Sequence, residues 1–200
     1  MYQNTPHDKR YRKTLSFLEK HLTKGSSILD LGVKNPLSQL MEQQGYNVKN
    51  TSGEDLEEDK SALIQSKAEV VTAFEILEHL LSSYELLKSI KAEKIVVSVP
   101  LRLWFSPAYR SKKDLWDRHF HEFEDWQLDW LLEKTGWKII ASEQWTNPNR
   151  GFGIRTILRY FTPRYYIVFA KKNKPKNCIS ILLYRFITRK NIYLKRSNLL

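Results

Sequence analysis

The sequence predicts an α/β fold with a doubly wound, mostly parallel sheet and a C-terminal antiparallel strand. Three observations support this prediction. Short apolar runs alternate with helical patterns, the first run ends in a turn typical of nucleotide-binding folds, and no long helix separates the last two runs. The 200 residues are enough for one domain with a full core. We expect residues 1–172 to form this domain and residues 173–200 to form a basic amphipathic extension.

The first strand, turn and helix are the most informative part of the chain. An apolar run at residues 27–31 ends in Asp30 and Gly32, as expected of a buried strand that stops at a tight turn. A helix is predicted at residues 36–44, because Asn35 can cap its free N–H groups and a proline suits its first position. Strand, tight turn and helix form the first unit of nucleotide-binding α/β folds.

The other elements continue this alternation. Helices are expected at residues 8–24, 82–91 and 123–135, and strands at residues 46–51, 69–74, 94–100, 137–142 and 165–170. The segment 60–66 fits a short helix and a shortened strand equally well, and a further short segment lies at residues 154–161. Residues 101–120 form a long loop rich in aromatic and basic side chains, and loops of this length inside a domain are usually functional.

Five of the six tryptophans divide into two groups by their position in these elements. Trp126 and Trp130 lie in the last predicted helix, and Trp137 begins the strand that follows, so all three are expected in the core. Trp104 and Trp116 lie in the long loop, where they are better placed to contact a bound acceptor molecule.

The net charge of +11 is concentrated in the last part of the chain. Residues 144–200 hold 13 Lys or Arg and no Asp or Glu, whereas the first 143 residues carry 20 basic and 22 acidic groups, a net of −2. A separated basic block of this kind suggests an anionic partner, such as nucleic acid, anionic lipid or a phosphorylated substrate. A solvated basic tail without a partner explains the pattern equally well.

The extension itself has an apolar stripe at helical spacing, formed by Ile179, Leu182, Leu183, Phe186 and Ile187. A basic amphipathic helix can lie in an anionic membrane interface, so residues 175–200 are candidates for contact with such a surface. The alternative is that the stripe docks on the domain or on a second subunit.

Cysteine content and hydropathy bear on the compartment. Cys178 is the only cysteine, which excludes an internal disulfide and a multi-cysteine zinc site, and no metal site is predicted. We expect a cytoplasmic protein with peripheral contact at the inner membrane surface. Charged residues interrupt the first apolar segment, which argues against a signal peptide. No apolar run reaches the roughly 18 residues that a membrane span requires.

Ligands of doubly wound folds lie at the carboxyl ends of the strands, near the switch in strand order. That rule indicates four places in this chain: the turn at residues 30–32, residues 50–55, Phe74 with Glu75, and the segment that begins at Pro100.

Three of these segments resemble class I S-adenosylmethionine-dependent methyltransferases. Residues 28–32 (Ile-Leu-Asp-Leu-Gly) resemble the first motif of that superfamily. Residues 74–80 (Phe-Glu-Ile-Leu-Glu-His-Leu) resemble the strand-to-helix segment of its small-molecule branch, which contains ubiquinone-biosynthesis methyltransferases. Residues 97–100 and 121–137 are similar to the later strand and helix of that branch. The likeness covers roughly residues 10–170 and implies a Rossmann-like methyltransferase fold.

The resemblance implies S-adenosylmethionine as cofactor and assigns roles to the strand ends. The turn at Gly32 would face the methionine part, and Asp30 would hold its amino group, while Phe74 and Glu75 would lie beside the sulfonium and the adenosine. An acidic residue after the second strand usually binds the ribose hydroxyls, because a carboxylate accepts two hydrogen bonds. The implied cofactor-binding residues are Asp30, Leu31, Gly32, Asn50, Thr51, Glu54, Asp55, Phe74 and Glu75.

The chain departs from the family pattern at two points. Lys34 and Pro36 stand where the second and third glycines of Asp-x-Gly-x-Gly-x-Gly belong, and side chains there can hinder close approach of a ligand to the backbone. The ribose-binding acid is absent from the end of the second strand, where Asn50 stands, and Glu54 and Asp55 can replace it only if their loop folds back.

Methyl transfer is an in-line displacement in which the enzyme mainly aligns the acceptor. A hydroxyl acceptor also needs a base, for which histidine is suited. His121 and His119 are the candidates, with His79 as a further choice, and a purely structural role is the alternative for each.

The sequence therefore predicts methyl transfer to an unidentified small or lipid-linked acceptor. The alternatives are a catalytically inactive binding or regulatory module with the same fold and, with less support, an RNA or DNA methyltransferase.

Overall fold

The computed structural model describes residues 6–112, 117–148, 151 and 153–173. Trp116 and the predicted extension beyond residue 173, with Cys178, lie outside the described residues, so the predictions made for them stay predictions.

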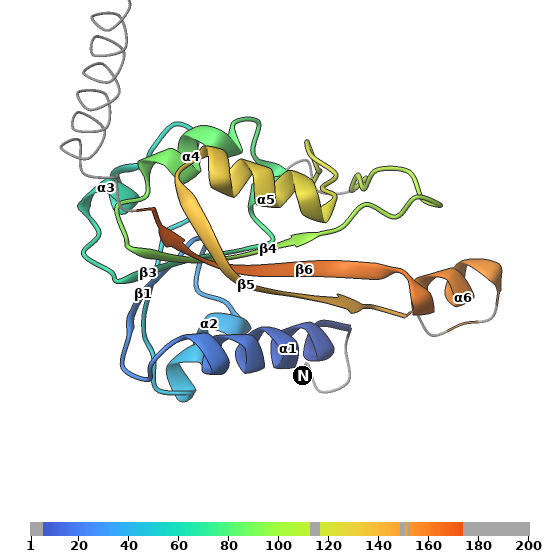
Figure 1. Cartoon of the computed structure of the whole chain (residues 1–200), viewed down its shortest axis with the longest axis horizontal. Coiled ribbons are helices and arrows are strands. Elements are labelled where there is room, and N and C mark those ends of the chain that lie inside the picture. Colours follow the sequence, from blue (N-terminus) through green and yellow to red (C-terminus); the bar gives the residue numbers. More distant parts are fainter. Residues whose placement is uncertain (1–5, 113–116, 149–150, 152, 174–200) are drawn as a thin grey trace, which may run out of the picture.

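A six-stranded sheet with the order β2-β1-β3-β4-β6-β5 forms the centre of the molecule (Figure 1). The strands are β1 (Ser27–Asp30), β2 (Asn47–Asn50), β3 (Val70–Phe74), β4 (Lys94–Pro100), β5 (Trp137–Thr146) and β6 (Pro163–Lys172). The first four pair in parallel, whereas β6 runs antiparallel to both β4 and β5. The predicted fold class is confirmed, including the antiparallel C-terminal strand.

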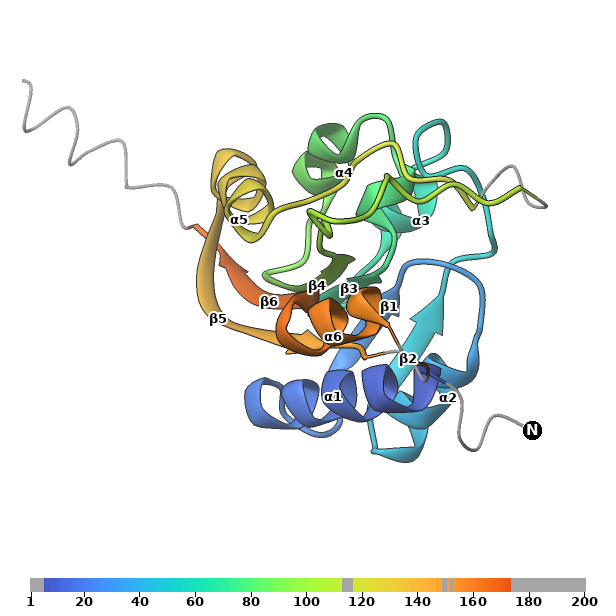
Figure 2. The same cartoon turned by 90° about the vertical axis from the view of Figure 1, so that its right-hand side faces the viewer.

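Helices cover both faces of the sheet. The helical elements are α1 (Pro6–His21), α2 (Pro36–Gln43), α3 (Ser61–Gln65), the 3₁₀ turn η1 (Leu77–His79), α4 (Ser83–Ser89), α5 (Asp125–Lys134) and α6 (Ile154–Phe161). Figures 1 and 2 show α1 and α2 on one face and α3, α4 and α5 on the other. Successive strand residues divide between two cores, because side chains alternate across a sheet: Val96 packs on the α1 side and Val97 on the α4 side.

The start of α2 matches the prediction from the sequence. The Asn35 side chain accepts hydrogen bonds from the backbone N–H groups of Leu37 (2.9 Å) and Ser38 (3.1 Å). In return, the Asn35 N–H donates to the Ser38 hydroxyl oxygen at 3.0 Å. This reciprocal capping satisfies donors that have no partner within the helix, and Pro36 at the first position has no N–H to satisfy.

Helix α5 corrects one prediction. Trp126 and Trp130 do not lie in the core, because their side chains are 55% and 57% exposed, and α5 buries Leu128 and Leu132 instead. The helix is turned so that this leucine pair, four residues apart, faces the sheet, which leaves both tryptophans on its outer side. Trp137 is buried, as predicted.

Two segments left undefined by the sequence are helical. Residues 61–65 form α3, and residues 154–161 form α6, which projects beyond the sheet at one end of the molecule (Figure 1). Within the described part of the chain, none of the helices is long and apolar enough to cross a membrane.

Candidate active site

Asp30 joins three strands at the carboxyl edge of the sheet. Its Oδ1 accepts a hydrogen bond from the Thr72 hydroxyl of β3 at 2.6 Å, and its Oδ2 accepts one from the Asn50 amide of β2 at 3.0 Å. The side chain is buried, and burial raises the pKa of Asp30 to about 6, although the hydrogen bonds from Thr72 and Asn50 oppose that rise. Both carboxylate oxygens of Asp30 therefore have a hydrogen-bond donor, and the side chain links β1 to β2 and β3.

The turn after β1 is open on one side at Gly32. The φ angle of Gly32 is +108°, a conformation that favours glycine. Its N–H donates to the Thr51 hydroxyl at 2.7 Å, and its carbonyl oxygen accepts from the Asn50 amide at 3.2 Å. A Cβ atom at this position would contact only Ile76, at 3.8 Å, so space remains beside the backbone for a ligand.

Glu75 holds a strained position directly after β3. Its φ of +56° is the only positive value at a non-glycine among the described residues, and such strain occurs preferentially at functional sites. Its N–H donates to the Ser98 carbonyl at 3.0 Å, and its Oε1 accepts from the Ser98 hydroxyl at 2.9 Å. Its Oε2 lies 3.3 Å from Nη1 of Arg10 on α1.

A small cavity lies between these strand ends and α1. It measures about 70 Å³ and is lined by Arg10, Tyr11, Thr14, Asp30, Leu31, Asn35, Leu37, Phe74, Glu75 and Ser98. Pockets for small-molecule ligands usually measure roughly 300–1,000 Å³, so this space has room for only a few water molecules. A larger cavity of about 300 Å³ lies at the opposite ends of β3 and β4, but none of the predicted site residues lines it.

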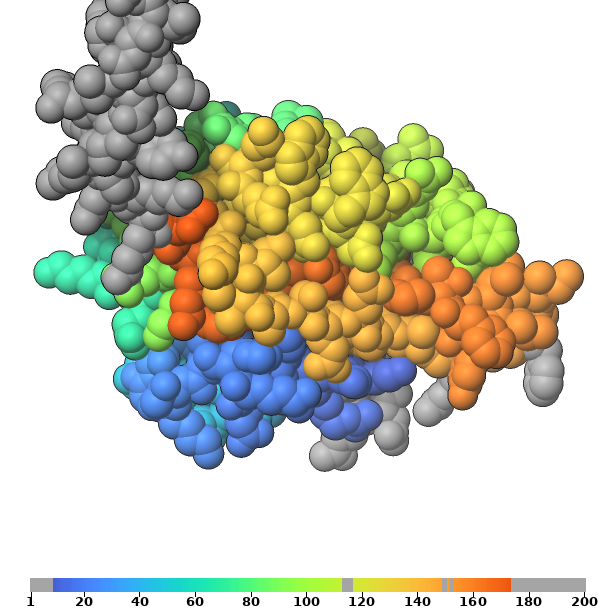
Figure 3. Space-filling model, viewed as in Figure 1, coloured from blue at the N-terminus to red at the C-terminus, as the bar shows by residue number. Residues whose placement is uncertain are grey.

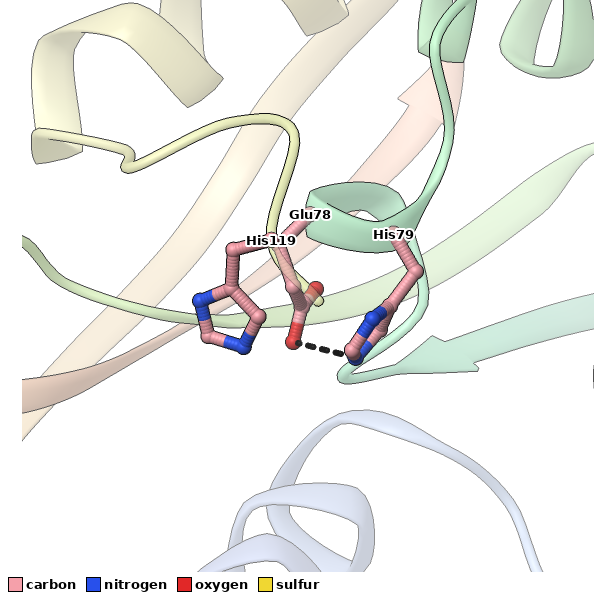
Figure 4. Close-up of side chains that lie close together, drawn as sticks. All are labelled: Glu78, His79 and His119. Atoms are coloured by element: carbon pink, nitrogen blue, oxygen red, sulfur yellow. Dashed lines mark ion pairs between the residues drawn. The ribbon is translucent and has the colours of Figure 1, made fainter. Parts of the chain in front are cut away.

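Three further side chains converge beside the strand ends (Figure 4). The side-chain ligand atoms of Glu78, His79 and His119 all lie within 4.8 Å of one another, and Nε2 of His79 is 3.8 Å from Oε1 of Glu78. The Glu78 backbone carbonyl accepts hydrogen bonds from the N–H groups of Phe120 (2.8 Å) and His121 (3.2 Å). These bonds fix the long loop to η1 and bring His119 to the cluster.

Both imidazoles of this cluster are oriented by their other ring nitrogen. Nδ1 of His119 lies 3.0 Å from Oε1 of Glu122, and Nδ1 of His79 lies 3.0 Å from the carbonyl oxygen of Arg118. These oxygens accept hydrogen bonds, so each Nδ1 is assigned the proton and each Nε2 keeps its lone pair. Although burial opposes it, hydrogen bonding from His119 and Tyr109 lowers the pKa of Glu122, which keeps that orienting carboxylate charged.

Glu78 is the unusual member of the cluster. Its side chain is 1% exposed, and its Oε2 has no hydrogen-bond partner among the described residues. Burial, reinforced by the charge of Glu75, raises the pKa of Glu78 well above its ordinary value. A buried carboxylate oxygen without a donor is costly, and a bound cation would satisfy it.

The predicted cofactor residues divide into three groups. Asp30, Leu31, Phe74 and Glu75 line the small cavity. The hydrogen bonds described above place Gly32, Asn50 and Thr51 around the same turn.

Glu54 and Asp55 are engaged within their own loop. Oε2 of Glu54 accepts from the Ser52 N–H at 2.6 Å, and Oδ1 of Asp55 accepts from the Glu57 N–H at 2.9 Å. Neither residue lines the cavity. Lys34 likewise pairs with Glu42 of α2, at 2.9 Å.

The two histidines predicted as catalytic bases, His119 and His121, lie in different surroundings. His119 belongs to the cluster, whereas Nε2 of His121 lies 3.3 Å from the Leu81 carbonyl oxygen, outside it. Sequence reasoning missed Arg10 and Glu78 as site residues. A sequence signal existed for Glu78, a charged residue next to a histidine between leucines, whereas none pointed from Arg10 to Glu75.

Comparisons with known proteins agree with this architecture. No protein-family model and no curated protein matches the sequence. The 1,6-didemethyltoxoflavin-N1-methyltransferase of Burkholderia thailandensis matches with a TM-score of 0.55 and 17% identity, over 84% of each chain. A SAM-dependent methyltransferase from Archaeoglobus fulgidus matches with a TM-score of 0.56 and 17% identity, over 81% of this chain and 94% of that chain.

A third match is an S-adenosylmethionine-dependent methyltransferase from Mesorhizobium loti, with a TM-score of 0.54 and 13% identity over 86% of this chain and all of that chain. The chain therefore has the fold of class I methyltransferases, as its motifs imply.

Proposed function

We propose that this chain transfers a methyl group from S-adenosylmethionine to a hydroxyl of a small or lipid-linked acceptor, beside a divalent metal ion held by Glu78, His79 and His119. The supporting observation is that the Gly32 turn, the Glu75 carboxylate and this cluster meet at one edge of a methyltransferase-like sheet. The similar B. thailandensis structure contains 1,6-didemethyltoxoflavin and S-adenosylhomocysteine, which supports the same cofactor here.

The strand-end residues fit this cofactor by their chemistry. The backbone at Gly32 is approachable, and the Glu75 carboxylate can accept hydrogen bonds from amino or hydroxyl groups. The cavity of about 70 Å³ is smaller than this cofactor, so binding would require lining side chains such as Arg10, which is paired with Glu75, to move. When bound, S-adenosylmethionine supplies a methyl group already activated by its sulfonium.

The cluster fits a divalent transition metal. Two imidazole nitrogens and one carboxylate are ligands that such metals prefer, and Glu122 and the Arg118 carbonyl orient the imidazoles. The ligand atoms lie within 4.8 Å of one another, so small side-chain movements would bring all three to one ion. A bound cation would lower the pKa of a coordinated acceptor hydroxyl. The Glu78 carboxylate would offset half of the charge of the divalent ion.

Calorimetric titration of the full chain with S-adenosylhomocysteine tests the cofactor. We expect binding that Gly32→Ala weakens at least about tenfold, because the new methyl group occupies the open side of the turn. Gly45→Ala is the matched control: Gly45 has a similar φ of +93° and no atom near its Cβ position, so both variants carry the same backbone strain.

Absence of binding at millimolar ligand would contradict the enzyme and favour the alternative function. That alternative is a binding or regulatory module that has the fold without the cofactor, and the small volume of the cavity is the observation in its favour.

A further inference from the structure

Helix α6 exposes the side that a helix of a globular protein normally buries. Ile154, Ile157 and Phe161 follow i, i+3, i+7 spacing and share one side, and Tyr160 borders it. All four are exposed, with values of 79% for Ile154 and 75% for Phe161. The half-buried residues of the helix are Thr156, Leu158 and Arg159, so two of the three less exposed positions are polar, while the exposed positions are mostly apolar.

Arginines lie around this apolar side. Arg155 and Arg159 belong to α6, and Arg164 follows it at the start of β6. Arg155 and Arg159 are four residues apart and therefore lie on one side of α6; burial, with the charges of Arg164 and Arg155, lowers the pKa of Arg159. Nε of Arg159 is buried and has no hydrogen-bond partner among the described residues. The sequence has no acidic residue after Glu143.

The helix lies at an end of the molecule, where a flat surface can reach it. Figure 3 shows α6 projecting at one end of the long axis, and Figure 2 views that end directly. Arg155 donates to the Ser106 hydroxyl at 2.9 Å, which joins α6 to the loop after β4. Trp104, two residues earlier in that loop, is 70% exposed and adds a large amphipathic ring to this end.

The positive charge around α6 limits which partner can bind to its exposed apolar side. A second copy placed on α6 by a two-fold axis would bring arginines against arginines. The chain's own segment 175–200 is basic and has no acidic residue, so it would meet the same repulsion. A bilayer with anionic headgroups offers hydrocarbon for the apolar stripe and phosphates for the guanidinium groups.

We propose that α6, with the neighbouring Trp104, docks the protein on an anionic phospholipid membrane, with Ile154, Ile157 and Phe161 inserted in the interface and the arginines at the phosphates.

Sedimentation of the full chain with phospholipid vesicles tests this docking without any methyl donor. The vesicles contain phosphatidylcholine alone or phosphatidylcholine with phosphatidylglycerol. We expect salt-sensitive binding to the anionic vesicles, and Ile157→Asp/Phe161→Asp should weaken it at least about tenfold. Ile64→Asp is the control, since Ile64 is also an exposed helical isoleucine but lies on α3, at the opposite end of the molecule (Figure 1).

A second variant tests the electrostatic part. Arg155→Gln/Arg159→Gln should reduce the preference for anionic over neutral vesicles and the dependence on salt. Equal binding by the wild-type chain and the double aspartate variant, with the far-ultraviolet circular dichroism of both unchanged, would overturn the proposal and assign binding to residues 175–200. A shift from dimer to monomer in the aspartate variant, without a change in vesicle binding, would instead identify a second copy as the occupant.

Discussion

Asp30 and Glu78 are two buried carboxylates at the same edge of the sheet, and their surroundings differ. Both Asp30 oxygens accept hydrogen bonds, from Thr72 and Asn50, whereas Oε2 of Glu78 has no partner among the described residues. Desolvation raises the pKa of both groups. The comparison indicates two roles for a buried carboxylate. One whose two oxygens both accept hydrogen bonds holds strands together, whereas one with an oxygen that lacks a donor is available to a ligand.

The largest expected effect concerns the pH dependence of Asp30. Its pKa is about 6 in the folded chain and 3.8 in the reference state, so its contribution to stability is complete below 3.8 and is lost as the pH rises through about 6. This loss amounts to about 3 kcal/mol. Asp30→Asn should remove that part of the decline in the free energy of unfolding, measured with urea across this pH range. An unchanged pH profile would contradict the assignment.

The hydrogen bond from Thr72 to Asp30 comes next in size. Thr72→Val keeps the shape of the side chain but removes a donor to a charged group, so we expect a loss of about 2 kcal/mol at pH 8. Thr135→Val is the matched control, because Thr135 is also buried and donates to the neutral carbonyls of Leu131 and Leu132. Equal losses in the two variants would show that the charge of Asp30 adds nothing.

For Glu78 we expect a substitution to raise the free energy of unfolding rather than to lower it. In chelator-treated protein, Glu78→Gln should raise the free energy of unfolding by about 1–2 kcal/mol at pH values above the raised pKa of Glu78, because it removes a buried charge whose Oε2 has no donor among the described residues. The same urea titration measures it. Destabilisation of similar size would mean that Glu78 is a structural brace like Asp30.

The smallest expected effect concerns the orientation of the His119 ring by Glu122. Glu122 contacts His119 rather than the ion position, so Glu122→Gln should weaken Zn²⁺ binding by about tenfold and leave the fold intact. Glu124→Gln, a nearby exposed substitution, provides the control in the same competition titration with a chromogenic chelator. Equal affinity in both variants would remove Glu122 from the site.

Local patterns made the frame of the molecule predictable. The Asn35 cap, the turn at Gly32 and the apolar strands depend on neighbours in sequence, and each is present as expected. The exposure of Trp126 and Trp130 was not predictable, because Leu128 and Leu132 form an alternative apolar side of the helix, and tertiary packing buries that side instead.

The site was predictable only in part, for a similar reason. The segment 74–80 marked one side of it, but the contact between Glu78 and His119 joins residues about forty positions apart through an irregular loop. The ion pair between Arg10 and Glu75 spans the two layers, and no spacing rule indicates it. The exposed apolar side of α6 could be recognised only in a structure that shows which side of the helix faces outward.

Calorimetric titration of the full chain with Zn²⁺ tests the central claim, that Glu78, His79 and His119 hold a divalent cation, most directly. We predict one site per chain, which Glu78→Gln and His119→Ala each weaken at least about a hundredfold. His121→Ala, which changes a neighbouring histidine outside the cluster, should leave the affinity unchanged. Equal Zn²⁺ affinity in the wild-type chain and in Glu78→Gln would contradict the claim.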